Sequence, residues 1–509
     1  MPVVIRHHWL AASLLGVTWG YAFPASARTD PPRLFGLVIG YNGSDDPAQA
    51  PLRYADDDAV KNAQLLKDLG ADYVLLTDLD ADTRRLYPDV ETTLPTHGAF
   101  ATAIERLNER MLAPENARRA HHLLVFYAGH GDVSQNEGFV HLADGHLSRT
   151  ELRELLSLSK ADVTHVIVDA CKSYFLVFDR GPGGERRPAL GQMPNEVASF
   201  PDNMGFLLST SSAADTHEWE ALQSGVFSHE VRSALRGAAD LDGDGKISYE
   251  EAAAFIFAAN RMIPNARYRP AVFARAPGGA ELSKATIVDI GDRSDSRLRV
   301  GPGVDEHLYV EDSRGNRISD LHPSSDLVVD LVLPASRPVF VREARTAREY
   351  QVDQAGIVAL ARISPRAQAA TLRGAEHVAF SLLFSEAYGK SSIVAYAADA
   401  ELEALQSPTT AWPPAWLGNT MLVGTGVLAA SGGALTGLAV SQRRHVNENT
   451  SNLKRIAANH RIDRYNVGAV VLYSLAASSL ATYLILKLWP QDEVRVEVSN
   501  PGPMSAVSP

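Results

Sequence analysis

The sequence predicts an α/β protein with a mainly parallel sheet flanked by helices, then a small β-sandwich-like domain and two transmembrane helices. In the first 280 residues, short apolar runs alternate with segments of helical periodicity, which is typical of parallel sheets. Residues 281–400 instead show short alternating runs separated by turns, which favours a β-sandwich. Two later stretches, 416–440 and 466–489, are mostly apolar and long enough to cross a bilayer.

Length and charge narrow the class of protein. A chain of 509 residues suggests about three domains. Its formal net charge of −12 gives no reason to expect nucleic-acid binding. The chain has a single cysteine, Cys171, so no disulfide can form within it.

Residues 1–27 have the pattern of a secretory signal peptide. A basic start at Arg6 is followed by an apolar core and by Ala25-Ser26-Ala27, a typical cleavage site. The alternative is an uncleaved membrane anchor. If the chain is exported, a lone thiol suggests a reactive group, because exported cysteines usually pair.

The segment 28–280 alternates strands and helices. Ser148 and Glu151 form a capping-box pattern before one helix, and Thr96 can cap another. The expected strands are 34–41, 73–77, 122–128, 165–168 and 205–210, and the expected helices are 57–69, 96–110, 148–156 and 227–235.

Two of these strands end in chemically reactive residues. The run 122–128 is followed by His130, and the run 165–168 is followed by Cys171. If the two strands are parallel neighbours, both side chains emerge at the carboxyl edge of the sheet, where ligands bind. An imidazole beside a thiol can generate the nucleophilic thiolate. The alternative is that each residue is an inert part of the core.

The motifs YAGHG and VDAC, with LFGLVIGYNG upstream, resemble the caspase-like cysteine peptidases, which include metacaspases and bacterial caspase homologues. The likeness covers about residues 33–275. It implies that Cys171 attacks the peptide carbonyl and that His130 acts as the base, while backbone N–H groups of Gly131 and Cys171 stabilise the oxyanion. One departure is Lys172, because metacaspases commonly continue Cys-His-Ser-Gly.

The resemblance also implies a substrate pocket. The family places a pocket residue two positions before the cysteine, which is Asp169 here, and a carboxylate favours cleavage after Arg or Lys. Alternatively, Asp169 only caps a neighbouring turn. Ser209 and Ser211 are assigned to the same cleft. A second pocket acid is expected among Asp45, Asp46 and residues 56–58, without a choice between them.

Two further features fall within the peptidase segment. The loop 179–201 is rich in Gly, Pro and Arg, and it occupies the place of the caspase intersubunit linker, which makes it a candidate for self-cleavage. The stretch after residue 239 matches a calcium-binding EF-hand loop, although it can also simply shape a connection. The expected ligands are Asp240, Asp242, Asp244, Lys246, Ser248 and Glu251.

The C-terminal part predicts a membrane anchor. A linker at 401–415 precedes the spans, and the basic segment 441–465 between them is expected to be a cytoplasmic loop, leaving the tail 490–509 outside. The sequence therefore predicts an exported, membrane-anchored cysteine endopeptidase that acts on proteins or peptides. The alternative is an inactive membrane scaffold or a receptor, and the oligomeric state stays open.

Overall fold

The computed structural model describes most of the chain in two compact units, Met1–Leu405 and Gln406–Pro509, which are treated separately below. The expected signal peptide 1–27, Ser211, the tail 490–509 and nearly all of the loop 179–201 lie outside the described residues. The described residues are 30–47, 49–134, 137–176, 200–210, 218–264, 269–291, 296–346, 348–367, 382–406, 415–445 and 452–488.

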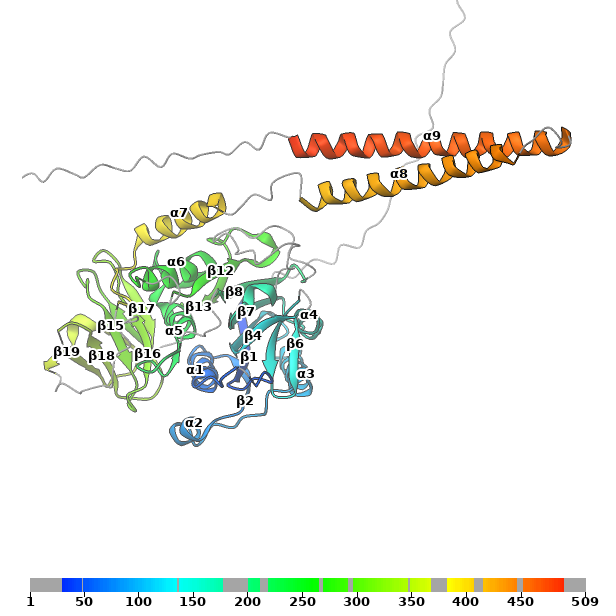
Figure 1. The fold of residues 1–509 in the computed structure, drawn as a ribbon. Coiled ribbons are helices and arrows are strands. Elements are labelled where there is room, and N and C mark those ends of the chain that lie inside the picture. Colours follow the sequence, from blue (N-terminus) through cyan, green and yellow to red (C-terminus); the bar gives the residue numbers. More distant parts are fainter. Residues whose placement is uncertain are drawn as a thin grey trace, which may run out of the picture. The chain divides into compact units, whose positions relative to one another are not determined.

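A six-stranded sheet forms the centre of the first unit (Figure 1). Every pair of neighbours is parallel except the edge strand β12, so the predicted mainly parallel sheet is confirmed. In spatial order the strands are β12 (Ala271–Arg275), β8 (Met204–Thr210), β7 (Val163–Asp169), β3 (Arg119–Gly129), β1 (Asp30–Tyr41) and β2 (Asp72–Thr77).

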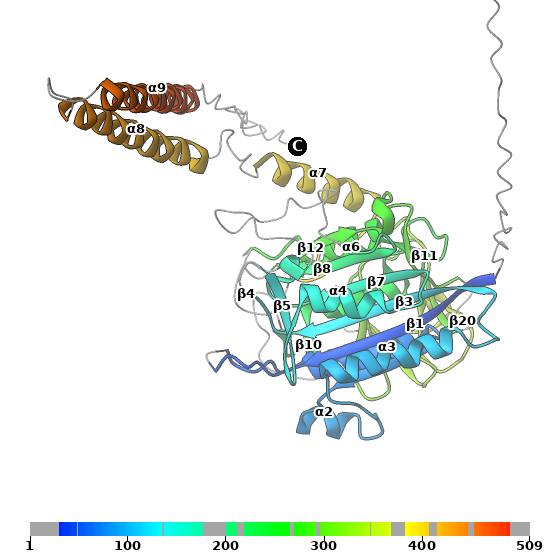
Figure 2. The same ribbon diagram turned by 90° about the vertical axis from the view of Figure 1, so that its right-hand side faces the viewer.

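Helices cover both faces of this sheet, because the side chains that its strands direct toward either face are mostly apolar. On β1, Leu34 and Val38 belong to the core beneath α1 (Ala55–Asp68), α5 (Val226–Ser233) and α6 (Tyr249–Asn260). Phe35 and Leu37 belong to the second core beneath α3 (His97–Met111) and α4 (Arg149–Ser157). Figure 2 shows α3 and α4 along the near side of the sheet.

Local signals define the ends of these helices as expected. Thr96 accepts a hydrogen bond from the N–H of Ala99 at the start of α3. Ser148 and Glu151 form the predicted capping box at the start of α4. The short helix α2 (Ala81–Leu86) was not expected, and its N-terminal N–H groups bond to the side chain of Asp80.

A three-stranded antiparallel sheet that the sequence did not reveal follows His130 directly. Its strands are β4 (Gly131–Ser134), β5 (Glu137–Leu142) and β6 (Gly145–Ser148). The pairing β4–β5–β6 brings Gly131 opposite Val140. The chain therefore turns away from the main sheet at the residues expected to carry the chemistry.

Residues 281–367 form two β-sheets, and most of the predicted strands are present. One sheet has the order β17 (Val329–Val332), β14 (Arg297–Val300), β20 (Ile357–Ala359). The other has the order β16 (Arg317–Leu321), β15 (Leu308–Glu311), β18 (Val339–Glu343), β19 (Arg348–Val352), β21 (Arg366–Ala367). Residues 368–381 of the segment expected to be β-rich lie outside the described residues.

The β-rich part packs closely against the helices of the preceding segment, and its status as a separate domain stays a prediction. Val310, Leu331 and Val341 belong to the same buried cluster as Val231 of α5 and Phe255 of α6. Across the expected boundary at 280, β11 (Lys246–Ser248) pairs with β13 (Thr286–Asp289). These contacts form because α5 and α6 are buried nearly all round and so need apolar partners on two sides.

A buried polar cluster links α5 to the β-rich part. Asp320 accepts hydrogen bonds from His229 of α5 at 2.7 Å, from His307 at 2.6 Å, and from Arg317. Burial opposes the ionisation of Asp320, but the charge of Arg317 and these hydrogen bonds hold its pKa well below its usual range. The two parts are thus joined by a desolvated ion pair as well as by apolar contacts.

The helices after residue 389 differ from the prediction at their boundaries. Helix α7 (Lys390–Gln406) occupies the end of the expected β-rich segment and the start of the expected linker. Helix α8 (Ala415–Arg444) contains the first expected span, but α9 (Asn452–Leu488) starts well before the second. Most of the expected loop 441–465 is therefore helix, because residues 452–465 contain no Pro or Gly to end it.

The helices α8 and α9 pack side by side as an antiparallel pair (Figure 1). Gly432 and Gly468 permit close contact, because a Cβ on them would lie 3.0 Å from the ring of Tyr473 and 2.9 Å from Leu435. Within the described residues, the segment Gly424–Arg444 is long and apolar enough to cross a membrane by length and composition. A membrane crossing by α9 stays a prediction.

Candidate active site

The main sheet brings the two predicted reactive residues to adjacent strand ends. Strands β3 and β7 are parallel neighbours in the register Ala128 to Asp169, so His130 and Cys171 each follow by two residues. Both residues are buried. A Cβ on Gly131 would lie 2.7 Å from the carbonyl oxygen of Cys171, so only glycine allows this close backbone contact. The two residues expected to supply the oxyanion N–H groups are therefore neighbours.

His130 is held by a backbone group. Its Nε2 lies 3.0 Å from the carbonyl oxygen of Ala50, so Nε2 carries the proton and donates it to that oxygen. The other ring nitrogen, Nδ1, is buried and has no hydrogen-bond partner among the described residues. Burial lowers the pKa of His130, which leaves the ring neutral and Nδ1 able to accept a proton at neutral pH.

The turn after Cys171 departs from the metacaspase motif, and the structure shows how it closes. Lys172 has φ of 54°, the left-handed conformation that glycine or asparagine usually occupies. Its Nζ lies 2.6 Å from Oδ1 of Asp132, which directly follows Gly131. The next residue, Ser173, donates its hydroxyl to the carbonyl oxygen of Ser209 on β8. This pair of contacts ties the turn to both neighbouring strand ends.

Asp169 lies at the end of β7, opposite Ser209 of β8. Its Oδ2 accepts hydrogen bonds from the N–H of Ser228 at 3.0 Å and from the hydroxyl of Ser228 at 2.7 Å. Burial, together with the nearby negative charge of Asp58, raises the pKa of Asp169 to about 6. Ser209, which was expected to line the substrate cleft, has a buried side chain, and its role in binding substrate stays a prediction.

A second carboxyl group, that of Glu218, lies near Asp169, although the sequence analysis did not single it out. Strand β9 (Glu218–Trp219) pairs with β10 (Ser224–Gly225), so Glu218 lies directly opposite Gly225. Glu218 accepts hydrogen bonds from the backbone N–H groups of Arg53 and Tyr54. Burial, and then the negative charges of Asp58 and Asp169, raise the pKa of Glu218 to about 7.

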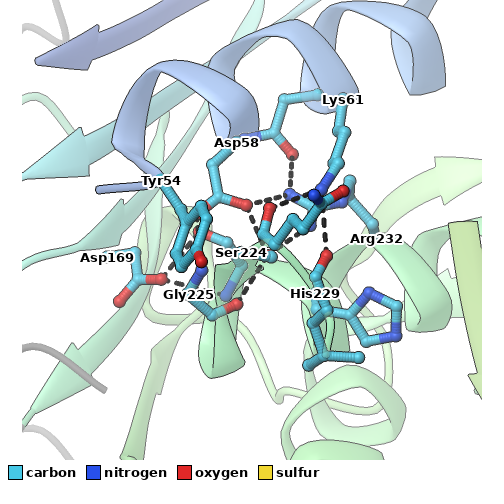
Figure 3. A network of polar contacts seen from close by, with 12 residues as sticks. Tyr54, Asp58, Lys61, Asp169, Ser224, Gly225, His229 and Arg232 are labelled. Carbon is cyan, nitrogen blue, oxygen red and sulfur yellow. Dashed lines mark hydrogen bonds and ion pairs between the residues drawn. The ribbon is translucent and has the colours of Figure 1, made fainter. Parts of the chain in front are cut away.

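Gly225 lies against two acids, Asp169 and Asp58, where a larger residue would not fit. A Cβ at this position would lie 2.6 Å from Oδ2 of Asp169 and 3.2 Å from Oδ2 of Asp58. The acids differ in their partners, as Figure 3 shows: Asp58 forms a buried ion pair with Arg232 at 2.9 Å, and it also accepts from Ser224 and Gly225. Asp169 and Glu218 bond to neutral groups in the described part of the chain.

The other candidate acids differ from Asp58 in their surroundings. Asp56 accepts from Asn42 and from the N–H of Asp80, and Asp57 accepts from Thr83, so both stabilise the base of α1. Asp45 lies beside two histidines of the β5–β6 hairpin. Asp58 is the candidate that flanks Gly225.

The comparison with protein families gives a match to the caspase domain over residues 34–255. This part of the chain is similar to caspase domains. The likeness indicates a cysteine peptidase of the caspase or metacaspase type. The search of curated proteins found no match.

Solved caspase structures also align with the chain. The crystal structure of caspase-1 from Spodoptera frugiperda is 12% identical, with a TM-score of 0.30, and the alignment covers 48% of this chain and 87% of that one. The structure of pro-sf-caspase-1 is also 12% identical, with a TM-score of 0.28 and coverage of 48% and 92%.

The acidic loop at the end of the caspase domain brings some of its predicted ligands together. Carboxylate oxygens of Asp240, Asp242 and Glu251 lie within 4.8 Å of one another. Asp240 accepts from the N–H groups of Gly243 and Gly245, while Glu251 accepts from Ser248 at the start of α6. Burial raises the pKa of Asp240 to about 6.

The other expected ligands of this loop have different positions. Asp244 accepts from the N–H of Lys246, and Ser248 caps α6. Lys246 lies on β11, where its backbone pairs with Asp289. Calcium binding by the full set stays a prediction.

Proposed function

We propose that this chain is a cysteine endopeptidase that cleaves peptide bonds after Arg or Lys, with Cys171 as nucleophile and His130 as base. The observation that carries the proposal is the presence of two carboxyl groups, those of the buried Asp169 and the half-buried Glu218, around the unsubstituted Gly225. Burial raises the pKa of both groups, and neither forms an ion pair among the described residues, so a substrate guanidinium or ammonium would stabilise their charged forms.

The positions of His130 and Cys171 support the following sequence of steps. Nδ1 of His130 takes the thiol proton, and the resulting thiolate attacks the substrate carbonyl carbon. The carbonyl oxygen becomes an oxyanion that accepts from the N–H groups of Gly131 and Cys171. The imidazolium then gives its Nδ1 proton to the departing amine, and a water molecule hydrolyses the thioester with His130 again as base.

The carbonyl oxygen of Ala50 would orient the His130 ring during these steps. When His130 is protonated, its Nε2–H still donates to the Ala50 carbonyl oxygen at 3.0 Å. The carbonyl dipole stabilises the imidazolium and fixes the ring so that Nδ1, not Nε2, exchanges the proton. A carboxylate in this role is therefore not required by the mechanism.

The test uses the full-length protein in detergent with fluorogenic peptides that end in Arg, Lys, Asp or norleucine. We expect release of the fluorophore after Arg or Lys, and none from Cys171→Ala. Hydrolysis only after Asp would reject the pocket argument while keeping the nucleophile. Absence of turnover, even after the 179–201 loop has been cut by an added protease, would favour the inactive scaffold.

We also propose that the helix pair α8–α9 anchors the chain in a membrane. The segment Gly424–Arg444 has the required length and composition, and basic residues cluster at the connection between the helices. With an exported peptidase domain, this connection would face the cytoplasm. Resistance to alkaline extraction, combined with protease protection of a tag inserted at 446–450, tests the anchor and its orientation.

A further inference from the structure

Three potential metal ligands meet beside the candidate active site. His141 of β5 and His146 of β6 are direct cross-strand partners in the antiparallel hairpin, so their side chains stand on the same face. Asp45 reaches this face from the segment between β1 and α1. Its Oδ1 lies 2.8 Å from Nδ1 of His141 and 2.7 Å from Nε2 of His146.

Packing fixes the two imidazole rings before any ion arrives. The ring of His146 stacks on Phe139 with a centroid distance of 3.9 Å, and the ring of His141 meets Phe139 edge-on at 5.3 Å. The side chain of His141 is 3% exposed, whereas those of Asp45 and His146 are 52% and 42% exposed. The cluster thus has a rigid buried wall and an open side through which a hydrated ion can enter.

The chemistry of the three side chains suits coordination. Two imidazoles and one carboxylate form a donor set that borderline divalent ions prefer, and three protein ligands leave a coordination position for water.

We propose that Asp45, His141 and His146 bind a divalent transition-metal ion of the zinc type, and that this ion braces the active site. By bracing we mean that the ion holds Ala50 and Gly131 in fixed positions around His130. The ion would replace the hydrogen bonds that Asp45 now makes to the two rings. The ligand atoms already lie within 4.8 Å of one another, so small side-chain shifts would admit the ion between them.

The two segments that carry the proposed metal ligands also position groups of the active site, which is why the ion would brace it. The N–H of His141 donates to the carbonyl oxygen of His130 at 3.1 Å, and its neighbour Val140 pairs with Gly131. The segment that carries Asp45 also carries Ala50, whose carbonyl oxygen orients the His130 ring. A metal bridge would therefore tie the group that aligns His130 to the strand that aligns Gly131. This second step rests on the proposed peptidase activity.

The binding test is independent of activity. Co²⁺ is titrated into metal-free, full-length Cys171→Ala protein in detergent, because this substitution removes the thiol as a competing ligand. We expect a visible d–d absorption band at one equivalent that Zn²⁺ displaces. In the same background His146→Gln should weaken Co²⁺ binding by at least about 100-fold, since even outer-shell partners change metal affinity by 10–100-fold.

A matched control is offered by a histidine that contacts the same hairpin. His97 of α3 pairs at 2.9 Å with the carboxylate of Asp144, which lies in the turn between β5 and β6, but His97 supplies no atom to the proposed site. His97→Gln should keep the cobalt band. A band that is absent, or equally strong in His146→Gln, would overturn the site and leave the three residues as a hydrogen-bonded cluster only.

The bracing is tested on the active protein with stoichiometric Zn²⁺ after chelation. We expect kcat to rise several-fold with KM unchanged, and His146→Gln to lose this response while keeping the activity of the chelated enzyme. A kcat that is unchanged or lowered by one equivalent of Zn²⁺ would overturn the bracing. If no peptidase activity exists, the cobalt titration still decides the site, so the two proposals fail separately.

Discussion

Replacing Asp169 with Asn should lower catalytic activity and raise the free energy of unfolding. The reason is that the buried carboxylate would bind the substrate but destabilises the folded protein. Burial raises the pKa of Asp169 from 3.8 to about 6. That difference corresponds to about 3 kcal/mol of destabilisation when the group is ionised in the folded protein. Asn keeps an oxygen that can accept from Ser228, so most of this cost should disappear.

The pH dependence of the effect has a definite sign. The folded-state pKa of Asp169 lies above the unfolded-state value, so the folded protein binds the proton more tightly. The penalty is absent below about pH 4, where both states are protonated, and it is complete above about pH 6. The free energy of unfolding of Asp169→Asn should therefore exceed that of the wild type by up to about 3 kcal/mol at about pH 8. The two proteins should be equal at about pH 4.

The same substitution should act on one substrate class. Removing one partner of a buried charge pair costs about 2–5 kcal/mol, so kcat/KM for peptides ending in Arg should fall by a factor of roughly 30 to 3,000. Peptides ending in norleucine should be almost unaffected. In the wild type, kcat/KM for Arg peptides should rise with pH through about 6 to 7, as Asp169 and Glu218 ionise.

Denaturant unfolding of the full-length protein in detergent, followed by tryptophan fluorescence, supplies the stability, and the peptide assay supplies the kinetics. Asp58→Asn is the matched control, since it leaves Arg232 buried without its ion-pair partner and should lose about 3–5 kcal/mol. If Asp169→Asn is destabilised alike at both pH values and loses activity on all peptides equally, Asp169 is a structural cap and the pocket reasoning is wrong.

Three further predictions concern neighbouring features. Gly225→Ala should lower kcat/KM for Arg peptides and lower the free energy of unfolding by about 1–3 kcal/mol, because its Cβ would lie 2.6 Å from Oδ2 of Asp169; normal kinetics would contradict the pocket. Asp320→Asn should lower the free energy of unfolding by about 3–5 kcal/mol, as Arg317 loses its buried partner, and a midpoint like that of the wild type would refute the coupling. We propose that Ca²⁺ binds the 240–251 loop, so it should raise the unfolding midpoint, and Asp242→Asn should reduce this increase; no effect of Ca²⁺ or chelator would reject it.

The order and type of the main elements could be predicted because local signals agreed with the fold. Apolar runs such as 165–168 are buried on both faces and could only be central strands. The caps at Thr96 and Ser148 depend on residues three positions apart, so they are visible in the sequence. The adjacency of the His130 and Cys171 strands was a condition of the prediction, and the parallel pairing of β3 with β7 meets it.

The elements that the sequence did not reveal are stabilised by distant partners. The β4–β6 hairpin is short and carries polar residues, and it is fixed by Gly131 against Cys171 and by Tyr127, whose hydroxyl contacts the carbonyl oxygens of His130 and His141. The β-rich part looked independent because its strands alternate regularly. Its dependence on α5 is visible only through contacts such as His229 with Asp320, which are 91 residues apart.

The groups proposed to determine specificity and proton transfer could not be predicted from the sequence, and the reason is a physical one. Ala50 acts through its carbonyl oxygen, which every residue possesses, so no residue type marks the position. Glu218 becomes a candidate pocket acid because β9 pairs with β10, and this two-residue pairing leaves no periodic signal. Sequence motifs therefore locate the candidate reacting residues, whereas the charge proposed to select the substrate arises from backbone geometry around Gly225. A relative with the same motifs but a side chain at this position would have the same nucleophile and a closed pocket.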